Sequence, residues 1–493
     1  MRGGRLLLAL GATLGALLVT EGVLRMPAVR TASPFETTPQ GTLVRSPAWG
    51  SLVEFELAPR PEPGRPRIVW MGESTVAGFP FNERPREPGR TEPTMSPPHW
   101  LAFILEARGV PAEVVTLAAP GIDSSELAEL FPHALALSPA AIVVTLGHNE
   151  YLESGLLLER PWWRHWQLAW HVRRLLGLDA LSTERLPTPQ DDFDHAEILA
   201  DFRERLETMR AQAADAGVPL LLCTPVCNLA DHPPLVGDDP RLSEDADAAW
   251  ARGRALLETG DVPGARAAFE AARDRDRWPH RATGPLIEAI AQVAGGGGSA
   301  DGGGARLVDV AAAFDAASTR GVPGFDLFMD HCHPDPGGQR LMALTVADAL
   351  EDAGVVEPAG HRGEAPELAA GLARFGLDDK ALAGMRAVMG RSYVGFAVVT
   401  GRWGAYAEFA LQNLQQAVAG MDAPGEVETS FALLELLRGD VEAARGHIDN
   451  ASRTAPEMVV KLQKAVERYP WMRAAFERNG VQLVKGRIVP LGA

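Results

Sequence analysis

The sequence predicts an α/β protein: a five-stranded, parallel, doubly wound sheet in flavodoxin-like order 2-1-3-4-5, with an inserted helical hairpin and a C-terminal all-α, repeat-like domain. Two observations predict the sheet. Short apolar runs alternate with helical patterns along residues 63–355, and each of the first three runs ends close to a glycine. Strands that alternate with helices form βαβ units, whose parallel sheet is covered by helices on both faces.

Residues 67–74 are expected to form the first strand and the sharp turn that ends it, with an apolar run at 68–71 that stops at Gly72. A continuous apolar run suits a central parallel strand that is buried on both faces. Ser74 follows this strand at its carboxyl end, where open α/β sheets build their binding sites. Ser74 is therefore a candidate functional residue.

The remaining elements of the sheet domain follow in alternation. Four more strands are expected at Glu113–Ala118, Ala141–Leu146, Val218–Thr224 and Arg306–Val310. Helical patterns lie at about His99–Ala107, Ser124–Ala136, Ala196–Ala216 and Leu341–Asp352. The first three strands are neighbours in the order 2-1-3, so the residues that follow them should meet at one edge of the sheet.

Two segments do not fit the sheet. Residues 246–282 predict a helical hairpin with a turn at Gly260-Asp261, and this hairpin resembles a single tetratricopeptide repeat. A glycine-rich loop is expected at 295–304. Residues 358–493 predict a helical domain in which 431–456 repeats the hairpin pattern. The two interpretations of this domain are a repeat domain that binds a protein partner and a plain helical cap.

The bulk composition excludes some classes of function. The chain has 493 residues, a size typical of about three domains, and a net charge of -17, which argues against a nucleic-acid partner. Cys223, Cys227 and Cys332 are too few and too irregularly spaced for a disulfide framework or a zinc site. We expect them to be free and mostly buried.

The N-terminus is predicted to be a targeting segment. Residues 1–26 contain basic Arg2 and Arg5, followed by an uncharged apolar stretch at 6–20. The stretch is short against the roughly 20 residues of a spanning helix, so both a cleaved signal peptide and an uncleaved membrane anchor are open. Either one places the body outside the cytoplasm, in the bacterial cell envelope. Residues 27–62 are expected to be a linker.

Four motifs follow one another along the chain: Gly72-Glu73-Ser74-Thr75, Gly121, Gly147-His148-Asn149-Glu150 and Asp330-His331-Cys332-His333. Together they resemble the motifs of the SGNH hydrolases, the GDSL lipase/esterase superfamily. The resemblance covers 63–355 without the inserted hairpin, and it is closest to a bacterial subset with tetratricopeptide-like repeats. Glu73 and Glu150 stand where the family usually has aspartate, and these acids support the site rather than react.

The resemblance implies a serine hydrolase mechanism. Ser74 is the expected nucleophile, His333 the base and Asp330 the group that orients His333, because acyl transfer needs all three. The expected oxyanion donors are the backbone N–H groups of Ser74 and Gly121 and the side-chain amide of Asn149. No cofactor is expected, and no metal either, because the histidines lack a recognised ligand spacing.

Each residue also has a plain structural interpretation. Ser74 alone could cap a helix, and Gly121 or Asn149 alone could belong to a turn. His331 competes with His333 as the base, although only His333 has the family's three-residue spacing from Asp330. The four motifs together, at the ends of the expected strands, favour a site.

The substrate is less well defined by the sequence. Phe79 and Phe81 either line an acyl pocket or pack locally, and His148 is expected in the wall of the site. The tryptophan-rich stretch at 161–170 is a site wall, an interfacial surface, a sugar platform or simply core. We expect a serine esterase acting on a small ester, a lipid or an acylated sugar. The alternatives are an O-acetyltransferase or deacetylase of an envelope polysaccharide, and a non-catalytic scaffold.

Overall fold

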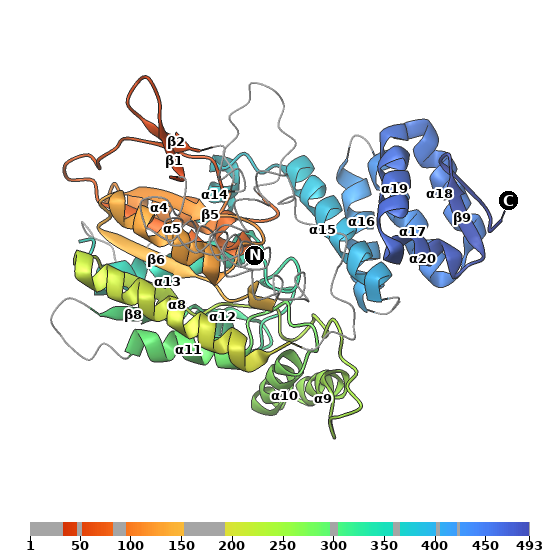
Figure 1. Cartoon of the computed structure of the whole chain (residues 1–493), viewed down its shortest axis with the longest axis horizontal. Coiled ribbons are helices and arrows are strands. Elements are labelled where there is room, and N and C mark those ends of the chain that lie inside the picture. The colour runs from red at the N-terminus through yellow and green to blue at the C-terminus, as the bar shows by residue number, and fades with distance from the viewer. Residues whose placement is uncertain are drawn as a thin grey trace, which may run out of the picture.

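The computed structural model describes residues 33–46, 52–81, 95–151, 193–295, 304–357, 365–400, 405–421 and 424–492 (Figure 1). The predictions for the N-terminal segment 1–26, for the tryptophan-rich stretch 161–170 and for most of the glycine-rich loop lie outside these residues. Among the described helices, none combines the length and the apolar character needed to cross a membrane.

The central sheet has five parallel strands in the order β5-β4-β6-β7-β8. They are β4 (Arg67–Gly72), β5 (Glu113–Ala118), β6 (Ala141–Thr145), β7 (Leu220–Cys223) and β8 (Ala305–Val308). In order of appearance this is 2-1-3-4-5, so the predicted topology is confirmed. Gly72 pairs with Ala118 on one side and with Thr145 on the other. The carboxyl ends of these three strands are therefore level.

Side chains alternate between the two faces of the sheet, as the twofold period of a strand requires. Ile68 and Trp70 of β4 belong to one hydrophobic cluster, and Val69 and Met71 belong to the other. The first face is covered by α4 (Pro97–Ala107), α12 (Val310–Ala317) and α13 (Pro336–Asp352). The second is covered by α5 (Ser124–Ala136), α8 (His195–Ala216) and α11 (Gly284–Gly295).

Several elements were not predicted. The expected linker contains a small antiparallel sheet of β1 (Phe35–Thr37), β2 (Leu43–Arg45) and β3 (Glu56–Leu57), so the interpretation of 27–62 as plain linker is wrong for these residues. Its strands are only two or three residues long, too short to show a period. Helices α11 and α12 were also missed.

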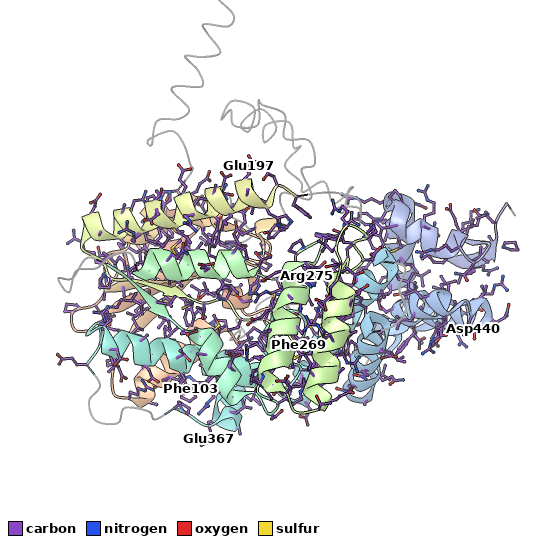
Figure 2. All side chains as sticks on the ribbon, turned by 90° about the horizontal axis from the view of Figure 1, so that it is seen from below. Phe103, Glu197, Phe269, Arg275, Glu367 and Asp440 are labelled. Carbon is purple, nitrogen blue, oxygen red and sulfur yellow. The ribbon has the colours of Figure 1, made fainter. Side chains whose placement is uncertain are left out.

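The inserted hairpin consists of α9 (Ala246–Glu258) and α10 (Val262–Asp274). Gly260 at the turn has a φ of 83°, which favours glycine, and Asp261 caps α10 by accepting the N–H of Gly264. The two helices approach closely at Gly253, which has no side chain. A Cβ at this position would lie 2.7 Å from the ring of Phe269, which is labelled in Figure 2. The predicted helical hairpin is confirmed.

The C-terminal part is mostly helical. Its helices are α14 (Leu368–Arg374), α15 (Asp379–Thr400), α16 (Ala405–Gly420), α17 (Glu428–Arg438), α18 (Val441–Thr454), α19 (Pro456–Arg468) and α20 (Pro470–Glu477), with a 3-10 turn η3 (Pro424–Val427). The chain then forms an antiparallel hairpin of β9 (Val481–Val484) and β10 (Arg487–Pro490), so an entirely helical end is not observed.

Helices α17 and α18 repeat the construction of α9 and α10. Gly439 has a φ of 83° at the turn, and Asp440, labelled in Figure 2, caps α18 by accepting the N–H of Ala443. The similarity of both hairpins to tetratricopeptide repeats stays a prediction. The helical part packs on the sheet domain through a shared apolar cluster that contains Leu235, Trp278 and Tyr393.

Candidate active site

The chain turns sharply at the end of β4, between Gly72 and Ser74. Gly72 has no room for a side chain, because a Cβ there would lie 2.3 Å from Val76 Cγ2 and 2.6 Å from the carbonyl oxygen of Thr145. The chain enters the short helix α3 (Ser74–Ala77) at once. Ser74 is thereby held at the carboxyl edge of the sheet, and it retains 9% exposure.

Ser74, His333 and Asp330 form a continuous chain of hydrogen-bonding distances. His333 Nε2 lies 2.7 Å from Ser74 Oγ, and His333 Nδ1 lies 2.6 Å from Asp330 Oδ2. Since a carboxylate only accepts, Nδ1 carries the proton and Nε2 presents its lone pair to the serine hydroxyl. The side chains of Ser74, His333 and Asp330, which were predicted to act together, are therefore adjacent in the structure.

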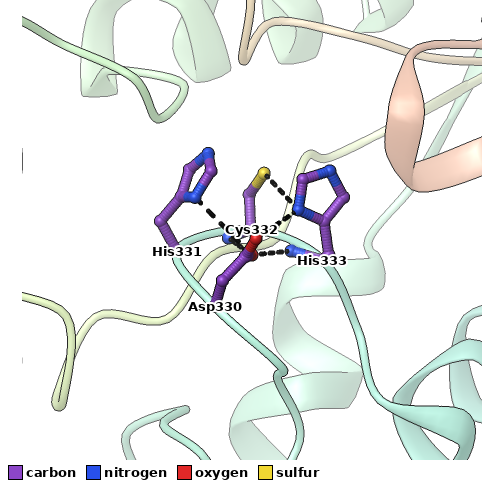
Figure 3. Close-up of side chains that lie close together, drawn as sticks. All are labelled: Asp330, His331, Cys332 and His333. Carbon is purple, nitrogen blue, oxygen red and sulfur yellow. Dashed lines mark hydrogen bonds and ion pairs between the residues drawn. The ribbon is translucent and has the colours of Figure 1, made fainter. Parts of the chain in front are cut away.

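The loop that carries Asp330 and His333 is held by its own backbone. Asp330 Oδ1 accepts the backbone N–H groups of Cys332 at 2.9 Å and of His333 at 2.8 Å (Figure 3). Burial alone would raise the pKa of Asp330, but the charges of His333 and His331 and the hydrogen bonds from His333 hold that pKa well below its usual range. Asp330 is therefore ionised whenever the site can work.

Glu73 supports the loop after β6. Its carboxylate accepts the backbone N–H groups of Gly147 and His148, both at 3.0 Å, and of Asn149 at 3.3 Å. Burial raises the pKa of Glu73 to about 8, although these hydrogen bonds oppose the rise. The extra methylene relative to aspartate thus lets one carboxyl group span three successive backbone donors and fix the position of Asn149.

The side chain of Asn149 joins the loops after β5 and β6. Its Nδ2 donates to the carbonyl oxygen of Ile122 at 2.8 Å. An amide nitrogen has two N–H bonds, so Ile122 takes one and a second is left. Gly121, next to Ile122, has a φ of 79°, and among the described residues, its two chain neighbours aside, no atom lies within 4 Å of where its Cβ would be. The open space there suits the approach of a substrate.

Glu150 connects the loop after β6 to the start of helix α5. It accepts the backbone N–H of Ser124 at 3.0 Å and the Ser124 hydroxyl at 2.7 Å, and Arg205 lies 3.9 Å away. Ser124 begins helix α5, which Asp123 and Glu126 cap reciprocally. Glu150 therefore ties the loop after β6 to the helix that follows Gly121, a supporting role that matches the expectation for this position.

The three predicted substrate-contact residues are placed differently. The Phe79 ring lies 4.6 Å from the His333 ring, centre to centre, beside the site. Phe81 is fully buried in the core with Trp70 and Trp100, so the structure assigns it to local packing and not to a pocket. His148 is buried behind the site, where its Nδ1 accepts the N–H of Ala282 at 3.1 Å.

His331 does not reach the serine. Its Nδ1 lies 3.6 Å from Asp330 Oδ1, and its ring packs against His280 and His232, with centroids 4.7 and 5.5 Å away. The geometry therefore favours His333 over His331 as the base. His232 and His280 were missed by the sequence interpretation, because they come from separate loops and no motif joins them. The cysteines are free and buried, as predicted.

The arrangement has the parts that acyl transfer needs. A hydroxyl is hydrogen-bonded to one nitrogen of an imidazole, and the other nitrogen of that imidazole is hydrogen-bonded to a buried carboxylate. Beside them lie a glycine backbone and an asparagine amide at the ends of the two flanking strands. This geometry lets the imidazole accept a proton from the hydroxyl, while the carboxylate stabilises the resulting imidazolium.

Comparisons with known proteins add only distant similarities. No protein-family model matches the chain, and no curated protein matches it. Among solved structures, one described as a GDSL-like lipase from Parabacteroides merdae is 16% identical, with a TM-score of 0.31, and the match covers 59% of this chain and 96% of that one. A GDSL-like lipase from Bacteroides thetaiotaomicron is 12% identical, with a TM-score of 0.31 and coverages of 58% and 88%.

An acetylxylan esterase from Geobacillus stearothermophilus is 14% identical, with a TM-score of 0.31 and coverages of 60% and 97%. The descriptions of all three proteins name a lipase or an esterase. At these TM-scores the similarities are too low to identify the activity of this chain, so a functional assignment depends on the site itself.

Proposed function

We propose that the chain is a serine esterase of the SGNH/GDSL type that cleaves a carboxylic ester. The observation that carries the proposal is the hydrogen-bonded series Ser74–His333–Asp330 at the carboxyl edge of the sheet. The four sequence motifs that resemble this superfamily support it, because all four lie around this point.

In the proposed reaction the Ser74 Oγ attacks the ester carbonyl carbon while His333 Nε2 takes its proton. The carbonyl oxygen becomes an oxyanion, and the tetrahedral intermediate collapses as His333 returns the proton to the departing alcohol. Water then attacks the acyl-serine, again with His333 as the base, and releases the carboxylic acid and free Ser74. Asp330 stays ionised throughout and stabilises the imidazolium.

The proposed oxyanion hole uses the backbone N–H groups of Ser74 and Gly121 and the amide of Asn149. Glu73 supports this proposal, because it holds the backbone of Asn149 in place. Donors that are fixed before the reaction cost no reorganisation when charge develops on the oxygen. Phe79, beside His333, is the proposed contact for the acyl or alcohol group.

The proposed setting is the bacterial cell envelope. The basic and apolar N-terminal segment supports export of the body, with the segment serving as an anchor or a cleaved signal. An ester-bearing small molecule, a lipid or an acylated sugar are all available substrate classes there. The helical C-terminal part is proposed to offer a surface for a protein partner.

The test is hydrolysis of p-nitrophenyl esters, from acetate to palmitate, by the detergent-solubilised full chain. Ser74→Ala is the inactive variant, and Ser243→Ala, at an exposed loop serine, is the matched control. We expect turnover that Ser74→Ala abolishes and Ser243→Ala preserves. The chain-length profile separates an acetyl esterase from a lipase-like enzyme. Turnover that survives in Ser74→Ala would refute the proposal.

A second assay addresses the acyl acceptor. If the chain is a transferase, adding an oligosaccharide should divert the acetyl group from water to the sugar, which mass spectrometry of the sugar detects. Hydrolysis at an unchanged rate with no acetylated sugar supports the esterase. No turnover on any ester, with a folded chain, would favour a scaffold function.

A further inference from the structure

Three histidines from three separate loops meet behind Asp330. His232 follows β7, His280 lies between α10 and α11, and His331 adjoins Asp330. One ring nitrogen of each lies within 4.8 Å of one ring nitrogen of each of the others. His232 is fully buried, His280 is 5% exposed and the His331 side chain is 14% exposed. Three imidazoles this close are a candidate ligand set for a metal ion.

The two buried rings have defined tautomers. His232 Nδ1 lies 2.9 Å from the carbonyl oxygen of Pro233, and His280 Nδ1 lies 3.3 Å from that of Trp278. A carbonyl oxygen only accepts hydrogen bonds, so both Nδ1 atoms carry the proton and both Nε2 atoms present a lone pair. In the described part of the chain, neither buried Nε2 has a hydrogen-bond partner. A buried acceptor without a partner destabilises the fold unless something else occupies its lone pair.

His331 lies beside Asp330, and its Nδ1 has no hydrogen-bond partner among the described residues. Its Nδ1 faces Asp330 Oδ1 at 3.6 Å, and its other ring nitrogen points away from the carboxylate (Figure 3). Metal-binding histidines commonly direct one nitrogen to a carboxylate or a backbone carbonyl and the other to the ion. His232 and His280 thus each keep one buried ring nitrogen without a hydrogen-bond partner among the described residues, and one ring nitrogen of His331 lies within 4.8 Å of one nitrogen of each.

We propose that His232, His280 and His331 bind one divalent transition-metal ion, with Zn²⁺ as the best match. Three neutral imidazoles suit zinc, and a water molecule or an anion would complete a four-coordinate site. The site is separate from the Ser74 reaction and does not depend on the proposed esterase activity. Its ion would hold together the three loops that carry His232, His280 and His331.

The surroundings are consistent with a small enclosed site. The rings of Tyr393, Phe396 and Tyr406, from α15 and α16, lie 5.9, 6.4 and 5.2 Å from that of His232. These aromatic rings close the histidine cluster from the helical part, which limits access of water. The ion would then join loops of the sheet domain beneath two helices of the C-terminal part.

Arg281 is a positively charged side chain beside His232, and its charge would repel a bound cation. Its Nη1 donates to the carbonyl oxygens of Asn228 and His232, both at 2.9 Å, and its buried Nη2 has no hydrogen-bond partner among the described residues. An anionic fourth ligand, such as hydroxide, would offset this charge and could accept from Arg281. A water-filled polar cavity without metal is the competing outcome, and the experiment separates the two.

The experiment measures metal binding directly and uses no activity readout. The full chain, freed of any polyhistidine tag and stripped with a chelator, is loaded with Zn²⁺ and dialysed, and its zinc content is determined by mass spectrometry. His232→Gln and His280→Gln remove ligands, while His133→Gln on α5 and His447→Gln on α18 are matched controls outside the cluster. Competition with a chromophoric chelator gives the dissociation constants.

We expect one zinc per wild-type and control chain, and at least a tenfold weaker affinity in His232→Gln and His280→Gln. Wild-type protein that retains no zinc would overturn the proposal. So would a variant with both His232→Gln and His280→Gln that still binds one zinc per chain. Circular dichroism checks the folding of each variant. If the variants unfold, Co²⁺ loaded into the wild-type chain decides, because intense visible bands indicate four-coordination and a weak octahedral spectrum would contradict the site.

Discussion

His333 Nε2 lies 2.7 Å from Ser74 Oγ, although the two residues are 259 positions apart in the chain. The parallel sheet produces this contact. Ser74 leaves the carboxyl end of β4, and the loop containing His333 lies at the same edge, held by the backbone hydrogen bonds to Asp330. The chemistry of the site therefore depends on how each of its side chains is held at this edge.

Ser74→Ala should abolish ester turnover and leave the fold intact. The hydroxyl contributes the hydrogen bond with His333, whose loss costs about 1 kcal/mol of unfolding free energy. The rate of p-nitrophenyl acetate hydrolysis and a urea unfolding curve measure the two effects. A large loss of stability would mean that Ser74 is mainly structural and would weaken its assignment as nucleophile.

His333→Ala should abolish turnover, whereas His331→Ala should retain activity well above that of His333→Ala. Only His333 contacts Ser74, while His331 contacts the opposite oxygen of Asp330. Steady-state kinetics of both variants, with His133→Ala as the unaffected control, test this difference. An active His333→Ala beside an inactive His331→Ala would reverse the assignment of the base.

Asn149→Ala should lower kcat by about two to three orders of magnitude with a small change in KM, since an oxyanion donor acts mainly in the transition state. The same change removes the hydrogen bond to the carbonyl oxygen of Ile122, so a modest loss of stability is also expected. The measurement is kcat and KM on the best p-nitrophenyl ester. A rise in KM alone would assign Asn149 to substrate binding.

Much of this site could be predicted from the sequence because its residues follow strands with clear patterns. Strand β5 was predicted at its observed bounds, and the ends of the other strands differ by at most two residues. Buried parallel strands are continuous apolar runs, so they are easily recognised. Glu73 was expected to support the site, but its three backbone contacts depend on the fold of the loop after β6.

The features that the sequence analysis missed are not marked by any pattern in the neighbouring sequence. His232 and His280 lie in irregular loops and meet only because the chain returns twice to the same edge. Phe79 and Phe81 are only two residues apart, yet Phe81 is in the core and Phe79 lies beside His333. Which way a loop side chain points depends on packing against residues distant in sequence, which spacing alone does not encode.

Glu73 should make the protein less stable as the pH rises. Burial raises its pKa from 4.5 to about 8, so between these values the folded chain binds a proton that the unfolded chain has lost. The stability from this group is fully present below pH 4.5 and is lost as the pH rises through 8. Glu73→Gln cannot titrate, so its unfolding free energy should fall less over this range.

Urea unfolding at several pH values between about 5 and 8 checks this, with Glu62→Gln, at an exposed residue, as the control. Wild type and Glu62→Gln should show the same pH dependence, and Glu73→Gln a flatter one. Identical slopes in all three proteins would mean that Glu73 is ionised in the fold, stabilised by its three backbone donors.

Tyr406→Phe should loosen the helical part from the sheet domain. The Tyr406 hydroxyl lies 3.0 Å from the carbonyl oxygen of Pro233 and 2.8 Å from that of Pro234, and its single proton is shared between them. The Pro233 oxygen keeps the Nδ1–H of His232, so Tyr406→Phe takes the donor from the Pro234 oxygen, at a cost of about 1–3 kcal/mol. We expect faster hydrogen exchange in the loop that contains His232 and a lower urea midpoint. Tyr469→Phe, at the junction of α19 and α20, is the matched control, and equal exchange in the two variants would show that Tyr406 does not fasten the two parts together.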